Sequence, residues 1–91
     1  MTTTTTNTPG YKDARYYAGL YRLARRAFDN EVAYNERALA SPLSAGNHEF
    51  HRQNLAMLTS GREMAMQPEF SASLDDERYG YAWRIHAASR R

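Results

Sequence analysis

The stretch from Tyr11 to Ala40 reads YKDARYYAGLYRLARRAFDNEVAYNERALA and decides the fold class of the chain. It contains no proline, and Gly19 is its only glycine. At about 100° per residue, its apolar residues gather on one half of a helical surface. These positions are Tyr16, Tyr17, Leu20, Tyr21, Leu23, Ala24, Ala27, Phe28, Val32, Tyr34, Ala38 and Leu39. We therefore predict one helix over residues 12–40, and its wide apolar arc predicts contact with two neighbouring elements.

Two shorter helices are predicted after this stretch. Ser41 and Pro42 are typical of a helix start, Asn47 is a second candidate N-cap, and Pro68 stops a helix. The second helix is therefore expected to start between Ser41 and His48, and we place it over residues 43–67. Ser73 is the expected N-cap of a third helix over residues 74–89, with acidic residues in its first turn and arginines near its end. The predicted buried face of the second helix comprises Leu43, Phe50, Met57, Leu58 and Met64. That of the third comprises Leu74, Tyr81, Ile85 and Ala88.

No segment alternates between apolar and polar residues with the period of two that marks a strand. The predicted fold is therefore all-α, a small three-helix bundle that forms a single domain over residues 11–91. Residues 1–10 read MTTTTTNTPG, which has no apolar face. We expect them to form a flexible, disordered N-terminal arm.

Composition narrows the function classes. The chain has 91 residues, a net charge of +2 and no cysteine, which excludes disulfides, thiolate catalysis and the usual cysteine-ligated metal sites. It has no apolar run of membrane-spanning length and no signal-peptide core, so we expect a cytoplasmic protein without a membrane partner. No nucleophile triad, phosphate loop or nucleotide fingerprint is visible. We therefore predict a protein that is not an enzyme and has no cofactor.

His48, Glu49 and His51 are the nearest approach to a metal-binding cluster. Two histidines three residues apart share one side of a helix, but a zinc site needs further ligands. The spacing also differs from the H-E-x-x-H motif of zinc proteases. A polar helix start without a metal is therefore the favoured interpretation.

Polar residues interrupt the predicted apolar faces. Glu31 and Asn35 fall in the arc of the first helix, Arg62 and Asn54 in that of the second, and Arg78 in the seam of the third. A buried charge requires a partner, because leaving one alone costs roughly 3–5 kcal/mol. Our hypothesis is that Glu31 pairs with Arg78 or Arg62 and fixes the helix register, with a small polar pocket or a partner-facing groove as the alternative.

The cations are almost all arginine, with Lys12 the single lysine. The outward side of the first helix carries Arg15, Arg22, Arg25 and Arg26, with no acidic residue between positions 16 and 28. Such a stripe suits an acidic protein surface or a phosphate backbone. Asp29 lies within one turn of Arg25 and Arg26 and partly neutralises them. An ordinary solvated helix face is the competing interpretation.

Tyr79 and Trp83 project from the third helix opposite its predicted seam. The only tryptophan of so small a protein is more often a core residue, so burial of Trp83 is favoured, with an exposed pair of partner anchors as the alternative. Our leading hypothesis is a small non-enzymatic protein-interaction module, an inhibitor, adaptor or assembly accessory, that binds a larger protein or complex. Two alternatives remain: a nucleic-acid-binding protein that uses the same arginines, and a homo-oligomeric structural protein. The predicted partner-binding residues are Arg15, Arg22, Arg25, Arg26, Tyr79 and Trp83.

Overall fold

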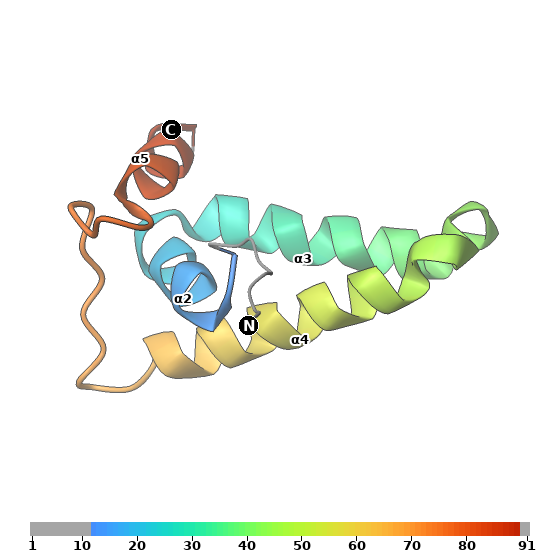
Figure 1. Cartoon of the computed structure of the whole chain (residues 1–91), viewed down its shortest axis with the longest axis horizontal. Coiled ribbons are helices and arrows are strands. Elements are labelled where there is room, and N and C mark those ends of the chain that lie inside the picture. The colour runs from blue at the N-terminus through green and yellow to red at the C-terminus, as the bar shows by residue number, and fades with distance from the viewer. Residues whose placement is uncertain (1–11, 90–91) are drawn as a thin grey trace, which may run out of the picture.

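A computed structural model describes residues 12–89, with the side chain of Ser44 excepted, and it shows an all-α protein (Figure 1). The elements are α2 (Ala14–Leu23), α3 (Arg25–Ala40), the 3-10 helix η1 (Pro42–Asn47), α4 (His48–Ala65) and α5 (Gly80–Ser89). Residues 12–89 contain no strand, which confirms the predicted fold class. The arm predicted at residues 1–10 lies outside the described range.

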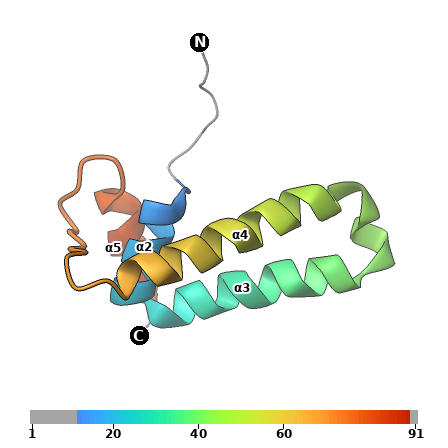
Figure 2. The same ribbon diagram turned by 90° about the horizontal axis from the view of Figure 1, so that it is seen from below.

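The longest helices, α3 and α4, form an antiparallel hairpin with η1 at its far end (Figures 1 and 2). At the other end, α2 crosses the pair and is seen nearly end-on in Figure 1. It packs most extensively against α4, and α5 packs on α2 and on α3. The arrangement agrees with the predicted three-helix bundle only in part, because α2 crosses the hairpin instead of running along it and α5 is a fourth helix.

The predicted helix over residues 12–40 is wrong in one respect, since it breaks at Ala24. This residue has φ −147° and ψ 68°, outside the helical region, and it is fully buried. No proline or glycine marks the break. The turn at Ala24 lets α2 and α3 bury their apolar sides against different neighbours, which agrees with the wide apolar arc.

The second predicted helix also divides. Pro42 starts η1, where the Ser41 side chain accepts a hydrogen bond from the backbone N–H of Leu43 at 3.2 Å. The α-helix begins at His48, with Asn47, the second candidate, at the N-cap position, and it ends at Ala65, two residues before the predicted end. The Ser–Pro start signal was therefore right about a helical turn, but that turn is the tighter 3-10 kind.

The third helix begins at Gly80, six residues later than predicted. The Ser73 hydroxyl accepts from the backbone N–H of Asp75 at 3.1 Å, and the Asp76 carboxylate accepts from that of Arg78 at 3.0 Å. These short-range bonds stabilise turns over residues 74–79 instead of a helix. The predicted seam of the third helix is wrong as well, because Leu74, Tyr81, Ile85 and Ala88 are exposed.

The core lies where α2 crosses the hairpin, and Trp83 of α5 is its largest member. The Trp83 side chain is fully buried, and its Nε1–H donates to the carbonyl oxygen of Tyr16 at 2.9 Å. A Cβ atom on Gly19 would overlap the Trp83 ring, so the glycine makes room for the indole. The core cluster comprises Tyr16, Tyr17, Leu20, Ala24, Phe28, Leu58, Tyr79 and Trp83. No helix in the described part of the chain is long and apolar enough to cross a membrane.

Candidate interaction surfaces

Two of the four predicted binding arginines hold the fold together. The Arg22 guanidinium donates through Nη1 to the carbonyl oxygen of Ala65 at 2.7 Å, and it thereby caps the C-terminus of α4. Arg15 lies 3.8 Å from the Asp76 carboxylate, donates to the carbonyl oxygen of Ser71 at 3.2 Å, and places its guanidinium 5.3 Å from the centre of the Phe70 ring. These contacts attach the segment between α4 and α5 to α2.

The other two arginines face solvent at the start of α3. Arg25 already has two partners nearby in the chain. Its guanidinium forms an ion pair with the Asp29 carboxylate at 3.1 Å and lies 4.4 Å from the centre of the Tyr21 ring. Arg26 is exposed and has no ion-pair or side-chain hydrogen-bond partner among residues 12–89. The predicted basic stripe therefore offers one uncommitted arginine.

The structure contradicts the prediction that Tyr79 and Trp83 are surface anchors. Both side chains have 0% exposure, and their rings lie 5.1 Å apart in the core. The Tyr79 hydroxyl donates to the Asp13 carboxylate at 2.8 and 2.9 Å. Burial, with the Asp13 hydrogen bond as the second cause, raises the pKa of Tyr79 to about 12. The two residues are buried because both rings pack against Tyr16 of α2, with ring centroids 5.9 and 6.4 Å away.

A buried polar cluster joins the two arms of the hairpin. Asn35 has 0% exposure, and its Nδ2 group donates to the carbonyl oxygen of Glu31 at 2.8 Å. Its Oδ1 atom accepts from Asn54 Nδ2 at 3.3 Å and lies 2.7 Å from Nδ1 of His51. Because an amide oxygen only accepts, the hydrogen on the His51 ring is assigned to Nδ1. Asn35 and Asn54, which interrupt the predicted apolar faces, therefore belong to one hydrogen-bond network between α3 and α4.

Large apolar side chains are exposed beside this network, and we call four of them the hairpin-end patch. The patch comprises Tyr34, Leu43, Phe50 and Met57, with exposures of 55%, 96%, 58% and 40%. The rings of Tyr34 and Phe50 both contact the His51 ring, with centroids 5.6 and 5.2 Å away. Phe50 and Met57 are two turns apart and share one side of α4. The patch thus spans both arms of the hairpin.

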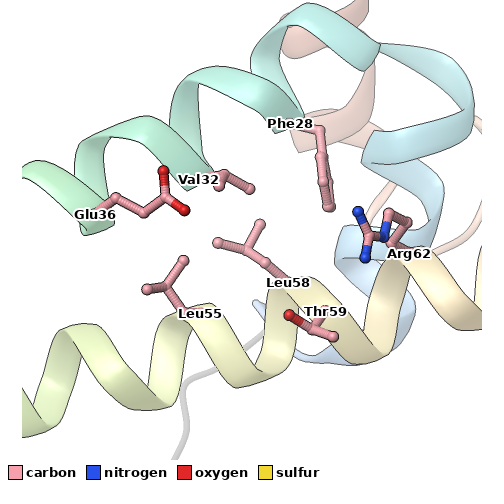
Figure 3. A pocket seen from close by; sticks show the side chains of 7 residues that line it. All are labelled: Phe28, Val32, Glu36, Leu55, Leu58, Thr59 and Arg62. Carbon is pink, nitrogen blue, oxygen red and sulfur yellow. The ribbon is translucent and has the colours of Figure 1, made fainter.

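A half-open groove lies on the other side of the hairpin (Figure 3). Its volume is about 290 Å³, and its lining residues are Phe28, Val32, Glu36, Leu55, Leu58, Thr59 and Arg62. Val32 and Leu58 lie in its middle, with Glu36 near one end and Arg62 near the other. Glu36 and Arg62 form no ion pair or side-chain hydrogen bond with any residue of the described range.

The Glu31 pairing is also wrong, since no ion pair joins it to Arg62 or Arg78. Arg78 precedes α5, where it is exposed and lies over the Tyr79 ring at 4.9 Å. The late start of α5 therefore removes Arg78 from the predicted seam. Glu31 instead lies near His86, where its charge opposes the lowering of that residue's pKa.

The histidines and Glu49 near the start of α4 each serve a local contact. His48 Nε2 lies 3.2 Å from the carbonyl oxygen of Ser41, and His51 belongs to the Asn35 network. Arg52 hydrogen-bonds Glu49 at 2.8 Å and thereby lowers the pKa of its carboxyl group. Within residues 12–89, no group of three metal-ligating side chains is placed to hold an ion.

Sequence reasoning missed the hairpin-end patch because it assigned those residues to buried faces. Tyr34 lay in the apolar arc, and Leu43, Phe50 and Met57 lay on the predicted inner face of the second helix. The wide apolar arc of residues 12–40 concerns Tyr34 alone, and its width is already explained by the two neighbours of α2 and α3. Comparison of the chain with family models, with curated proteins and with solved structures found no match.

Proposed function

We propose that the protein is a small non-enzymatic protein-interaction module that binds a larger protein through the hairpin-end patch. The observation that carries this proposal is the exposure of Tyr34, Phe50 and Leu43, each more than half accessible at the end of the hairpin that α2 and α5 do not cover. The rings of Tyr34 and Phe50 flank the same His51 ring, and exposed apolar side chains that lie close together are typical of a protein contact site. Aromatic residues in particular combine large area with low side-chain entropy at interfaces.

The rigidity of the support favours this surface over the predicted arginine face. Tyr34 and Phe50 project from two helices that the buried Asn35–His51 bond joins, so a partner would meet a pre-organised pair of rings. A pre-organised surface loses less conformational entropy when it binds. The basic face has a smaller role in the proposal: Arg26 would contribute charge steering toward an acidic partner.

A pull-down with matched variants tests the proposal. The full chain is expected to retain a partner protein in stoichiometric amount, and Tyr34→Gln combined with Phe50→Gln is expected to lose it. Tyr81→Gln is the control, because Tyr81 is 75% exposed but lies on α5. Circular dichroism melts must show that both variants remain folded. Equal retention by the patch variant and the control would overturn the proposed surface.

The nucleic-acid alternative has its own readout in the same material. Binding through arginine–phosphate contacts would weaken steeply with added salt and would fall on replacement of Arg25 and Arg26 by glutamine. Arg22 is unsuitable for this test because it caps α4. Salt-sensitive nucleic-acid binding that survives the patch substitutions would favour the alternative over a protein partner.

A further inference from the structure

We propose that the groove face of the hairpin, defined by Val32, Glu36, Leu55 and Arg62, binds the same face of a second copy of this chain in a twofold-symmetric dimer. This inference goes beyond the proposed function, because it concerns a different face and a different partner. Its first basis is that the groove opens on the side of α4 away from α2, which touches the groove only at its Phe28 end, where the Phe28 and Tyr21 rings lie 5.0 Å apart. Thr59 lines the groove while Gly61, two residues later, contacts α2, and residues two apart lie on opposite sides of a helix.

The second basis is the placement of charge. Figure 3 shows an apolar strip with Glu36 and Leu55 toward one end and Phe28 and Arg62 toward the other. Glu36 is eight residues after Phe28 in α3, so the strip is about 12 Å long at 1.5 Å per residue. The carboxylate and the guanidinium therefore lie at opposite ends, and neither has a partner among residues 12–89.

A face with opposite charges at its two ends is complementary to itself. A twofold axis that lies in the contact plane, perpendicular to the line that joins Glu36 to Arg62, exchanges the two charged ends. Glu36 of one copy then meets Arg62 of the other, and the same pair forms again at the far end, as an isologous interface requires. The apolar strips of Val32 and Leu55 meet in the middle, where the two hairpins cross face to face.

The size of the face sets the expected strength. Two helices side by side are about 20 Å wide, so two hairpins that cross cover about 400 Å² on each copy. The total of about 800 Å² is that of a weak, transient contact. We therefore expect a dissociation constant in the micromolar range and a monomer–dimer equilibrium, not an obligate dimer.

Sedimentation equilibrium of the full chain across micromolar to millimolar concentration, with charge-reversal variants, tests the dimer. Glu36→Arg and Arg62→Glu each place like charges together at both ends of the interface. Each is expected to weaken self-association by at least about tenfold. An equimolar mixture of the two variants is expected to restore the dimer, since one copy then carries only cations at the two positions and the other only carboxylates.

Matched controls separate the contact from net charge. Glu63→Arg and Arg37→Glu make the same changes in charge at exposed positions outside the groove, and they are expected to dimerise like the parent. All four substituted side chains are exposed, so melts should show folded proteins throughout. Three results would each overturn the proposal. The parent could stay monomeric at the highest concentration, the controls could weaken dimerisation as much as the groove variants do, or the mixture could fail to restore the dimer. The patch variants should leave dimerisation unchanged, because Tyr34 and Glu36 lie on opposite sides of α3.

Discussion

Replacing Gly61 by alanine tests the closest contact in the fold, the crossing of α2 over α4. A Cβ atom on Gly61 would lie 2.6 Å from the Cβ atom of Tyr17, 2.8 Å from the carbonyl oxygen of Ala14 and 2.9 Å from the backbone nitrogen of Ala18. Ordinary contacts between carbon atoms are about 3.5–4.0 Å, so the added methyl group is short of space by about 1 Å. Two of the three opposing atoms belong to the backbone, and rotation of a side chain relieves none of these contacts.

The helices must therefore separate, and the free energy of that separation sets the expected magnitude. Overpacking a well-packed core costs about 1–3 kcal/mol, and we take the upper end because backbone atoms are involved. Alanine is the better helix former by about 1 kcal/mol, which offsets part of this cost. The net loss in the free energy of unfolding is about 2 kcal/mol, or roughly 8–16 °C in melting temperature for a domain of this size.

Thermal unfolding followed by circular dichroism measures the loss, and Gly46→Ala is its matched control. Nothing lies within 4 Å of a Cβ atom on Gly46, so its replacement is expected to leave stability unchanged or slightly raised. A Gly61→Val variant should lose more than Gly61→Ala, because it adds further atoms at the same contact. A Gly61→Ala protein as stable as Gly46→Ala would refute the close approach of α2 to α4, because helix propensity alone would then govern both sites.

Three further predictions concern capping and titration. Arg22→Gln removes the charged cap on the Ala65 carbonyl and should cost about 1 kcal/mol in a urea melt, whereas Arg26→Gln should cost less than about 0.5 kcal/mol. The pKa of Tyr79 is about 12 in the fold against 10.0 ordinarily, so its contribution to stability is complete below pH 10 and lost as the pH rises toward 12. At pH 11 the loss reaches about 1 kcal/mol. Urea melts at pH 8 and pH 11 should therefore show a smaller decrease in the free energy of unfolding for Tyr79→Phe than for the parent. Burial, and secondly the charge of Lys12, lower the pKa of His86 below 6.5, while Glu31 has the opposing effect. The free energy of unfolding should therefore fall as the pH drops below 6.5, and His86→Gln should reduce that fall. Equal acid sensitivity of the variant and the parent would contradict the assignment.

The arginines show how far a contact surface could be predicted from the sequence. Their exposure followed from the helical period, and Arg25 and Arg26 do face solvent. The partner of Arg22, however, is a carbonyl group 43 residues away in the chain. Whether an exposed cation is free for a partner or already caps a helix depends on such distant contacts, and local spacing carries no information about them.

The exposed apolar residues also show that local spacing does not determine which helix faces are covered. The spacing correctly placed Phe50 and Met57 on one side of a helix, but it did not determine whether that side would be covered. The short α2 covers only one end of the hairpin, so the apolar side chains at the other end remain exposed (Figure 1). The length of α2 is set by the break at Ala24, which no proline or glycine signals.

By itself, the sequence determined that this protein is helical and where the chain leaves the first helical stretch. Long apolar periodicity without proline favours helices, and Ser41 with Pro42 ends that stretch, because both effects act within a few residues. The tertiary structure alone decided the break at Ala24, the burial of Trp83 and the exposure of Tyr34. Each of these depends on which distant segment lies opposite, and burial of apolar area against that segment outweighs the small local preferences of the backbone.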